Sequence, residues 1–312
     1  MLIIFPGQLC IMNEITVLRI LGNFKATKTI FQGEDRLPKY APFPNAKTYE
    51  MSFIYASNIE ELANELSALN DKQLVIRGAP IHGVDESRYV QRVKFNPRLS
   101  DSKTPNQHPF IDQPSNWVMF DFDKEPLPEG FDLRTDPEDA ITYLIQRLPQ
   151  EFQECTCFWR LSSSAGLAYL HSPPEPARSV SGHLWFWLKD PQTSDALNAF
   201  AMAYNQLSDT KLIDNAMFNP VQGHLVTDPI FRDPYTDPLS IRAGLIRGTS
   251  EEVDIDISSY INEWKVQNET LPTSIRSSIG NTTLINIMFA HMRATLRSLA
   301  GQRINLDHVA VI

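Results

Sequence analysis

Two aspartates stand two positions apart, directly after a hydrophobic run of strand length. The run is Trp117–Phe120, and Asp121 and Asp123 follow it before a Pro-rich loop. Because side chains alternate along a strand, both carboxylates should point to the same face. Neighbouring carboxylates repel each other unless a cation lies between them, and Mg²⁺ or Mn²⁺ prefers such oxygen ligands. The pattern indicates either a divalent-metal site or a solvated acidic turn.

Two further short motifs contain residues that could serve the same chemistry. Ser181 and His183 flank a glycine where an apolar strand is expected to begin, after a Pro-rich loop. Asp214 follows the apolar pair Leu212-Ile213. Taken singly, a histidine at the start of a strand is most often structural, and an aspartate before a turn usually caps it. It is the order of the three motifs along the chain that makes them candidates for one site.

The elements that must position these residues follow from hydrophobic periodicity and capping signals. Ser57 and Glu60 form a plausible capping box for a helix that ends near Leu69. The order of strands and helices after it predicts an open sheet backed by helices, in the α/β (α+β) class. Expected strands lie at 15–20, 26–30, 74–76, 117–120, 155–161 and 183–188, and expected helices at 57–69, 135–148, 193–206 and 281–299.

Composition limits the classes of function. The 312 residues are 42% hydrophobic, and no apolar run approaches the ~20 residues of a membrane span. Three cysteines (Cys10, Cys155 and Cys157) favour a reducing compartment, so a cytoplasmic protein is expected. No Cys/His quartet accompanies them, and no zinc is expected.

The net charge of −9 argues against a protein that coats nucleic acid through bulk charge. A local basic track is compatible with it. Positive residues gather between positions 77 and 98, and they are either a solvated loop surface or a track for a nucleic-acid backbone. The members of this segment are Arg77, Arg88, Arg92, Lys94 and Arg98.

In order and separation, the three motifs resemble those of the archaeo-eukaryotic primase superfamily. That family has a hydrophobic strand ending in Asp-x-Asp or Asp-x-Glu, then Ser-x-His, then a hydrophobic residue followed by Asp. The similarity covers roughly residues 70–250 and is closest to the primase-polymerases of phages, plasmids and other mobile elements. The loop 160–166 and the segment 218–224 also look like that group. The zinc-binding cysteines of several relatives are absent, which leaves open whether the chain can start primers alone.

The resemblance implies a two-lobed catalytic core with an RRM-like sheet and a helical tail. Residues 1–114 would form the N-terminal lobe, and residues 115–250 the RRM-like lobe with the active site. Residues 251–312 would be a helical segment that could lead into a further domain. The implied activity is that of a DNA primase or DNA-directed polymerase, which transfers nucleotides from NTP or dNTP onto a primer or an initiating nucleotide.

The resemblance also assigns roles to residues. Asp121, Asp123 and Asp214 would hold two Mg²⁺ or Mn²⁺ ions for the in-line attack on the α-phosphorus. His183 would donate to the triphosphate, and Ser181 would orient the loop. Ser162 and Ser163 could offer hydroxyls or backbone N–H groups to phosphate, while Arg160 is either a phosphate clamp or an edge-strand charge. The expected template is single-stranded DNA, contacted by Arg88, Arg92, Lys94 and Arg98, and a replicative helicase in cis or in trans stays open as a partner.

Two other readings compete with this one. A phosphatase of the haloacid-dehalogenase type also has a hydrophobic-Asp-x-Asp motif, but it requires Gly and then Thr or Ser where this chain has Lys124 and Glu125. A replication initiator or strand-binding domain on the same fold would be non-catalytic. It differs from the enzyme in whether the three carboxylates come together and bind metal.

Overall fold

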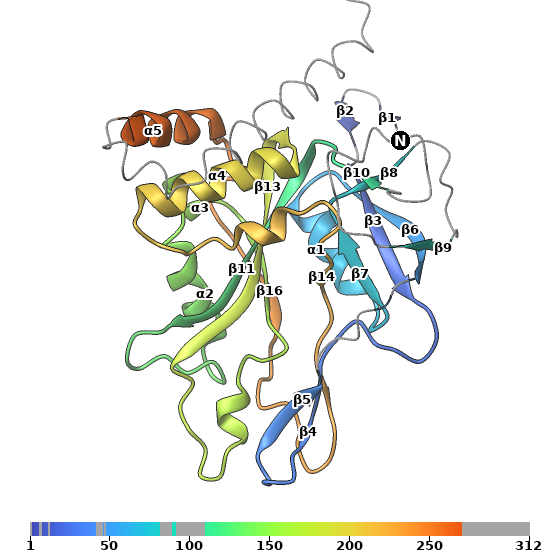
Figure 1. The fold of residues 1–312 in the computed structure, drawn as a ribbon, viewed down its shortest axis with the longest axis vertical. Helices are drawn as coiled ribbons and strands as arrows, with labels where there is room; N and C mark the ends of the chain where they lie inside the picture. Colours follow the sequence, from blue (N-terminus) through green and yellow to red (C-terminus); the bar gives the residue numbers. More distant parts are fainter. Residues whose placement is uncertain are drawn as a thin grey trace, which may run out of the picture.

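The computed structural model describes residues 2–5, 8–11, 13–41, 46, 48–81, 89–91 and 110–269. This part of the chain is mixed α+β, with several antiparallel sheets and the helices that pack on them (Figure 1). None of its helices has the length and apolar character needed to cross a membrane. Two predictions lie outside the described residues: the basic residues Arg88, Arg92, Lys94 and Arg98, and the helix at 281–299.

The first sheet has five strands in the order β14-β7-β3-β6-β9. Helix α1 packs on one face, where Leu62 and Leu66 meet Ile15, Val17 and Val75. The last strand in sequence, β14, joins the edge of the sheet from more than 100 residues away. The bounds are β3 Asn13–Ile20, β6 Thr48–Ala56, α1 Ile59–Ala68, β7 Gln73–Ile76, β9 Tyr89–Gln91 and β14 His224–Leu225.

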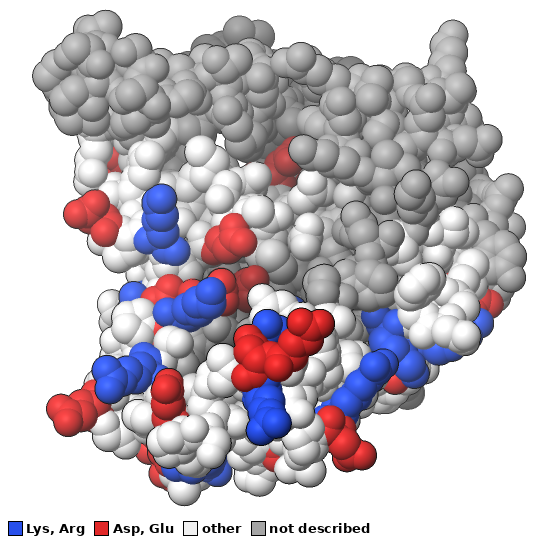
Figure 2. Space-filling view, turned by 60° about the horizontal axis from the view of Figure 1, so that its bottom comes forward, with Lys and Arg blue, Asp and Glu red and all other residues white. Residues whose placement is uncertain are grey.

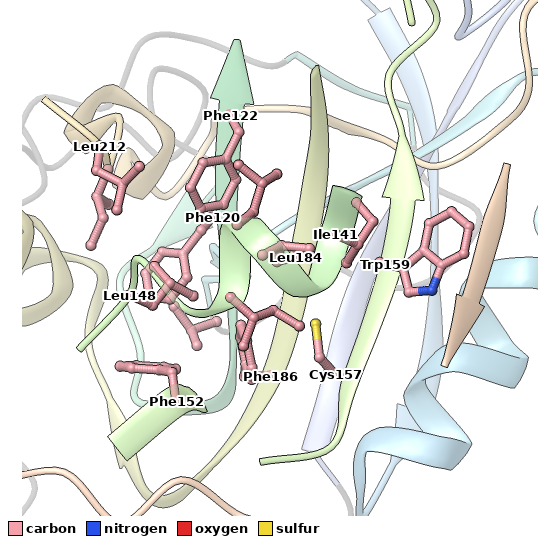
Figure 3. Close-up of a cluster of buried hydrophobic side chains, with 14 of the residues drawn as sticks. Phe120, Phe122, Ile141, Leu148, Phe152, Cys157, Trp159, Leu184, Phe186 and Leu212 are labelled. Carbon is pink, nitrogen blue, oxygen red and sulfur yellow. The ribbon is translucent and has the colours of Figure 1, made fainter. Parts of the chain in front are cut away.

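The second sheet is antiparallel, in the order β11-β13-β12-β16. On one face, Phe120, Leu184 and Phe186 of the strands meet Ile141 and Phe152 of the helical segments (Figure 3). Figure 1 shows α2, α3 and α4 on this side of the sheet and the first sheet on the other. The bounds are β11 Ser115–Pro126, α2 Pro137–Ile145, α3 Gln150–Gln153, β12 Cys157–Leu161, β13 Ser179–Gln192, α4 Ser194–Leu207 and β16 Ala243–Ile246.

A small sheet, in the order β15-β4-β5, projects at the bottom of Figure 1. Strand β15 pairs in parallel with β4, and β4 pairs with β5 as a hairpin. Residues 224–231 therefore join strands from the first third of the chain, although the sequence assigned them to the lobe at 115–250. The remaining bounds are β1 Leu2–Phe5, β2 Gln8–Ile11, β4 Thr29–Gln32, β5 Pro38–Ala41, β8 Ala79–Pro80, β10 Phe110–Ile111, η1 Leu167–Leu170, η2 Asn215–Phe218, β15 Ile230–Phe231 and α5 Ile257–Glu269.

Two sequence predictions need correction. The capping residue of α1 is Asn58, not Ser57: Asn58 Oδ1 accepts the N–H of Glu61 at 2.9 Å, and the Ser57 N–H donates to the Glu61 carboxylate. Strand β13 begins at Ser179, so His183 lies inside the strand and not at its start. Helix α5 lies within the segment 251–312 that was expected to be helical, and it packs on α4 through Trp264 and Tyr260.

Candidate active site

The second sheet has another face, opposite α2–α4, and this face changes from apolar to polar along its strands. Trp117 and Met119 of β11, Trp185 of β13 and Phe158 of β12 are buried in one cluster with α1 and the first sheet. Met119, Trp185 and Phe158 are cross-strand partners, so they form one row. Two residues further along β11, the row becomes polar. The apolar rows hold the two sheets together, and the polar rows form the candidate site.

The first polar row is Asp121, His183 and Arg160, on the neighbouring strands β11, β13 and β12. His183 Nε2 lies 3.3 Å from Asp121 Oδ1. On the other side of His183, Arg160 Nη1 donates to Asp228 Oδ1 at 2.6 Å. Within the described part of the chain, His183 Nδ1 and Arg160 Nε are buried without a hydrogen-bond partner. The row therefore places unused nitrogen atoms of a histidine and an arginine on neighbouring strands.

The second polar row is Asp123, Ser181 and Ser162, and a β-bulge shapes it. Phe122 pairs with Gly182 and Glu125 with Val180, so Asp123 and Lys124 together face Ser181. Lys124 takes the left-handed conformation that this bulge requires (φ 57°). The Ser181 hydroxyl accepts the Lys124 N–H at 2.8 Å and lies 3.3 Å from Asp123 Oδ1, to which it donates.

Ser181 therefore fixes both the bulged backbone and the carboxylate of Asp123. The resemblance implied that Ser181 would orient the loop; in the structure Ser181 lies in β13, where its hydroxyl contacts β11 and its carbonyl oxygen accepts the Ser162 N–H. The residue between Ser181 and His183 is glycine because the strands approach closely there: a Cβ on Gly182 would lie 2.9 Å from the carbonyl oxygen of Arg160. The spacing of the Ser-x-His motif thus lets Ser181 contact Asp123 and His183 contact Asp121.

The prediction that Asp121 and Asp123 share a face is confirmed, since they contact His183 and Ser181, two residues apart on β13. The repulsion expected between them does not decide the pKa of Asp121. Burial by itself would raise this pKa, but the hydrogen bond and charge of His183, helped by His224 and Lys28, lower it overall. Asp121 is therefore held as a carboxylate, available as an oxygen ligand.

The loop after β12 continues the second row. Ser162 N donates to Ser181 O at 2.9 Å, and the hydroxyls of Ser162 and Ser164 are 3.0 Å apart. Ser163 of the same loop is buried, and its role as a donor of a hydroxyl or backbone N–H to phosphate stays a prediction. Buried Arg242 fixes the loop, because it donates to the carbonyl oxygens of Ser162 and Ala165 while it pairs with Asp237.

Asp214 is exposed and caps η2, where its Oδ1 accepts the Ala216 N–H at 2.9 Å. Phe218, in the same turn, packs edge-on against Phe120 of β11. Among the residues that the structure describes, no group of three or more His, Cys, Asp or Glu side chains is arranged to hold a metal ion. The structure thus brings Asp121 and Asp123 together on one face, while convergence of Asp214 with them stays a prediction.

Three residues act on this site from the first and small sheets, and of these only His224 lies in a segment, 218–224, to which the resemblance had pointed. Asp228 pairs with Arg160, and Lys28 and His224 contribute to the lowered pKa of Asp121. Hydrogen bonds between the segments around residues 28 and 229 bring Lys28 and Asp228 together. Ile230 N donates to Lys28 O at 3.0 Å, and Thr27 Oγ1 donates to Asp228 O at 2.9 Å. Contacts between positions about 200 residues apart leave no periodic pattern in the sequence.

Arg77 was predicted as part of a basic track, and this is wrong. Its guanidinium is buried, lies 4.7 Å from the centroid of the Trp117 ring, and donates to the carbonyl oxygens of Trp117 and Gln192 and to the Ser194 hydroxyl. Burial lowers the pKa of Arg77 to about 10. Its donors are used inside the protein, where they join the end of β7 to the second sheet.

Comparison of the chain with protein-family models, with curated proteins and with solved structures found no match. The functional argument therefore rests on the two polar rows.

Proposed function

We propose that the chain is a nucleotidyltransferase of the primase-polymerase type, which transfers nucleotides from NTP or dNTP to a 3′-hydroxyl on a single-stranded DNA template. One observation carries the proposal. The Asp-x-Asp and Ser-x-His motifs lie on neighbouring strands, and each motif's pair of side chains contacts the other's: Asp121 with His183, and Asp123 with Ser181. The position of β13 between β11 and β12, with helices on the opposite face, supports the RRM-like lobe that the resemblance implies, whereas β16 pairs with β12 and not, as in an RRM sheet, with the first strand.

The residues fit a divalent metal. Mg²⁺ is commonly bound through one or two carboxylates together with substrate phosphates and water, and Asp121 and Asp123 supply two such groups on one face. A bound metal would supply stabilisation of the attacking and leaving oxygens. Ser181 keeps Asp123 in place through the bulge. Asp214 belongs to the proposal as a third carboxylate.

His183 and Arg160 would bind the triphosphate. Their buried nitrogen atoms, His183 Nδ1 and Arg160 Nε, are on cross-strand partners, next to the carboxylate row. Nitrogen donors at fixed positions in a partly buried site favour the charge that develops on transferring phosphates. Asp228 and Asp121 hold the two side chains from either side, so the row keeps its geometry without a ligand.

Primer extension on a labelled primer–template with Mg²⁺ or Mn²⁺ tests the proposal. Asp121→Asn and Asp123→Asn should each lower nucleotide incorporation by a factor on the order of 10² or more, because a single electrostatic contact to the transition state is worth about that much. Asp190→Asn is the matched control: Asp190 is an exposed aspartate at the far end of β13. If Asp121→Asn and Asp123→Asn both extend primers at the wild-type rate, the proposal fails.

Direct Mn²⁺ binding, measured by calorimetry without nucleotide, separates the roles of the two motifs. The double variant Asp121→Asn/Asp123→Asn should lose Mn²⁺ binding, whereas His183→Ala should keep it and instead raise the nucleotide KM. Mn²⁺ binding lost in His183→Ala would place the histidine among the metal ligands. A wild-type chain that binds DNA but neither Mn²⁺ nor nucleotide would be the non-catalytic strand-binding domain.

The setting in the cell is also part of the proposal. Cys155 and Cys157 are both free and buried, which agrees with a reducing compartment such as the cytoplasm. Replication of a phage or mobile element, with a helicase in cis or in trans, is the context that the motifs suggest.

A further inference from the structure

The small sheet carries a half-exposed aromatic ring beside a lysine. Tyr40 of β5 is directly opposite Ile30 of β4, and opposite residues of an antiparallel pair share a face. Ile30 is fully buried, whereas Tyr40 is 50% exposed, so Tyr40 lies at the open margin of this face. Lys28, two residues before Ile30, shares the face, and its Nζ is 5.0 Å from the centroid of the Tyr40 ring.

The same face of the small sheet looks toward the candidate site. Phe231 of β15 is the other neighbour of Ile30, and the Arg242 guanidinium lies 5.7 Å from the centroid of its ring. Asp228, which leads into β15, pairs with Arg160 of the first polar row. The Lys28 carbonyl accepts the N–H of Ile230 at 3.0 Å, two residues after Asp228. Lys28 therefore connects the Tyr40 ring with the row of Asp121, His183 and Arg160.

An exposed ring with a cation beside it is the arrangement that binds single-stranded nucleic acid without regard to sequence. A base stacks on the ring, and the cation meets the phosphate backbone. A protein partner fits less well, because Leu37 and Tyr40 are the large hydrophobic side chains that this sheet exposes, and two such residues make a small apolar patch. The observations favour the nucleic acid.

The charges around the small sheet point to a weak, stacking-dependent interaction. Figure 2 brings the bottom of Figure 1 forward, and on that face Lys and Arg side chains alternate with Asp and Glu. Lys39, beside Tyr40, is already paired with Asp35. Because cations and carboxylates are mixed on this face, affinity should depend more on the ring than on bulk charge.

We propose that Tyr40 and Lys28 form a stacking platform that holds a base of single-stranded DNA beside the Asp121 row. The proposal deepens the function proposed above, since it gives the template strand a place next to the site. Binding to the platform needs neither metal nor nucleotide, so it can be measured apart from catalysis.

The test is fluorescence anisotropy of a labelled oligothymidylate with the full chain in EDTA. Tyr40→Ala should weaken binding about 5- to 150-fold, the range expected for the loss of one base–aromatic stack, while Tyr40→Phe should stay close to wild type because it keeps the ring. Lys28→Ala should reduce the slope of log affinity against log salt by about 0.7, the value for one phosphate contact on a single strand. Phe24→Ala is the matched control, since Phe24 is a 59% exposed aromatic residue outside the small sheet.

Three results would overturn the platform: wild-type affinity in Tyr40→Ala, equal weakening in Phe24→Ala, or no measurable binding by the wild-type chain. Thermal unfolding of each variant shows whether a loss of binding reflects a loss of fold. Primer extension by the same preparations keeps the two proposals apart. Weak binding by Tyr40→Ala together with an inactive wild-type chain would support the platform and refute the polymerase. Wild-type binding by Tyr40→Ala together with an active wild-type chain would support the polymerase and refute the platform.

Discussion

Two halves of one sheet face can be compared directly, because the same strands β11, β13 and β12 form both. In the apolar half, Met119, Trp185 and Phe158 make a cross-strand row buried against α1 and the first sheet. In the polar half, one strand period further, Asp121, His183 and Arg160 occupy the same three strands. Backbone geometry changes little between the halves until the bulge at Asp123. The difference lies in the side chains: the apolar half supplies stability, and the polar half supplies groups that could do chemistry.

The largest expected effect is a difference in the free energy of unfolding between a substitution in the apolar half and one in the polar half. Trp185→Ala removes a fully buried indole that packs on the Trp117 ring at a centroid distance of 5.3 Å. Such a truncation should lower the free energy of unfolding by about 3–5 kcal/mol. His183→Ala, two residues along the same strand, should cost less, about 1–3 kcal/mol for the partner that Asp121 loses, while it impairs nucleotide use. Urea unfolding of both variants makes the comparison, and equal losses of stability would show that the polar half is also part of the structural core.

The second effect tests the buried charge at the far end of the apolar half. Arg77 lies over Trp117, so Arg77→Met keeps much of the packing but leaves the carbonyl oxygens of Trp117 and Gln192 without their donors. We expect a loss of about 3 kcal/mol, as for other buried groups whose charged partner is removed. Arg19→Met is the control, because the Arg19–Glu50 pair is exposed and should contribute at most about 1 kcal/mol. Equal losses of stability in the two variants would mean that the buried hydrogen bonds of Arg77 do not hold β7 to the second sheet.

Much of this arrangement could be predicted from the sequence, because it depends on local patterns. Alternation along 117–123 placed Asp121 and Asp123 on one face, and capping signals located α2 and α4 within two or three residues. The four-strand order and the return of residues 224–231 to the first and small sheets could not be predicted. Those pairings join positions far apart in the chain, and they depend on which hydrophobic faces meet.

The details of the candidate site show the same limit. The bulge at Asp123 and Lys124 has no glycine to mark it: the left-handed position is taken by Lys124, whose N–H donates to the Ser181 hydroxyl. Arg77 looked like one more residue of a basic segment, yet it is buried against Trp117. A pattern of charges in the sequence does not show which basic side chain will find enough hydrogen-bond acceptors inside the protein to replace its hydration. Lys28 and Asp228 reach the site only through the small sheet.

The smallest effect compares carboxylates at the two ends of the second sheet. The pKa of Asp121 is lowered overall, whereas burial and then the charge of Asp112 raise the pKa of Asp195 to about 6. Asp112 and Asp195 lie at the first turn of α4, where both oxygens of Asp112 accept backbone N–H groups from Ser194 and Asp195. A raised carboxyl pKa means that the folded state binds more protons than the unfolded state between about pH 4 and pH 6. Stability should therefore fall as the pH rises through that window.

Asp195→Asn should remove this cost. The shift of about two pKa units corresponds to roughly 2–3 kcal/mol, but partial exposure reduces it, and the loss of a negative charge at a helix N-terminus offsets it by about 0.3–1 kcal/mol. We expect the variant to be about 1 kcal/mol more stable than wild type at pH 7.5 and no more stable at pH 4, by urea unfolding at both values. Asp139→Asn, an exposed aspartate in the first turn of α2, is the matched control and should lose a few tenths of a kcal/mol instead. A gain of the same size for Asp195→Asn at both pH values would show that the ionised, buried carboxylate of Asp195 is not its cause.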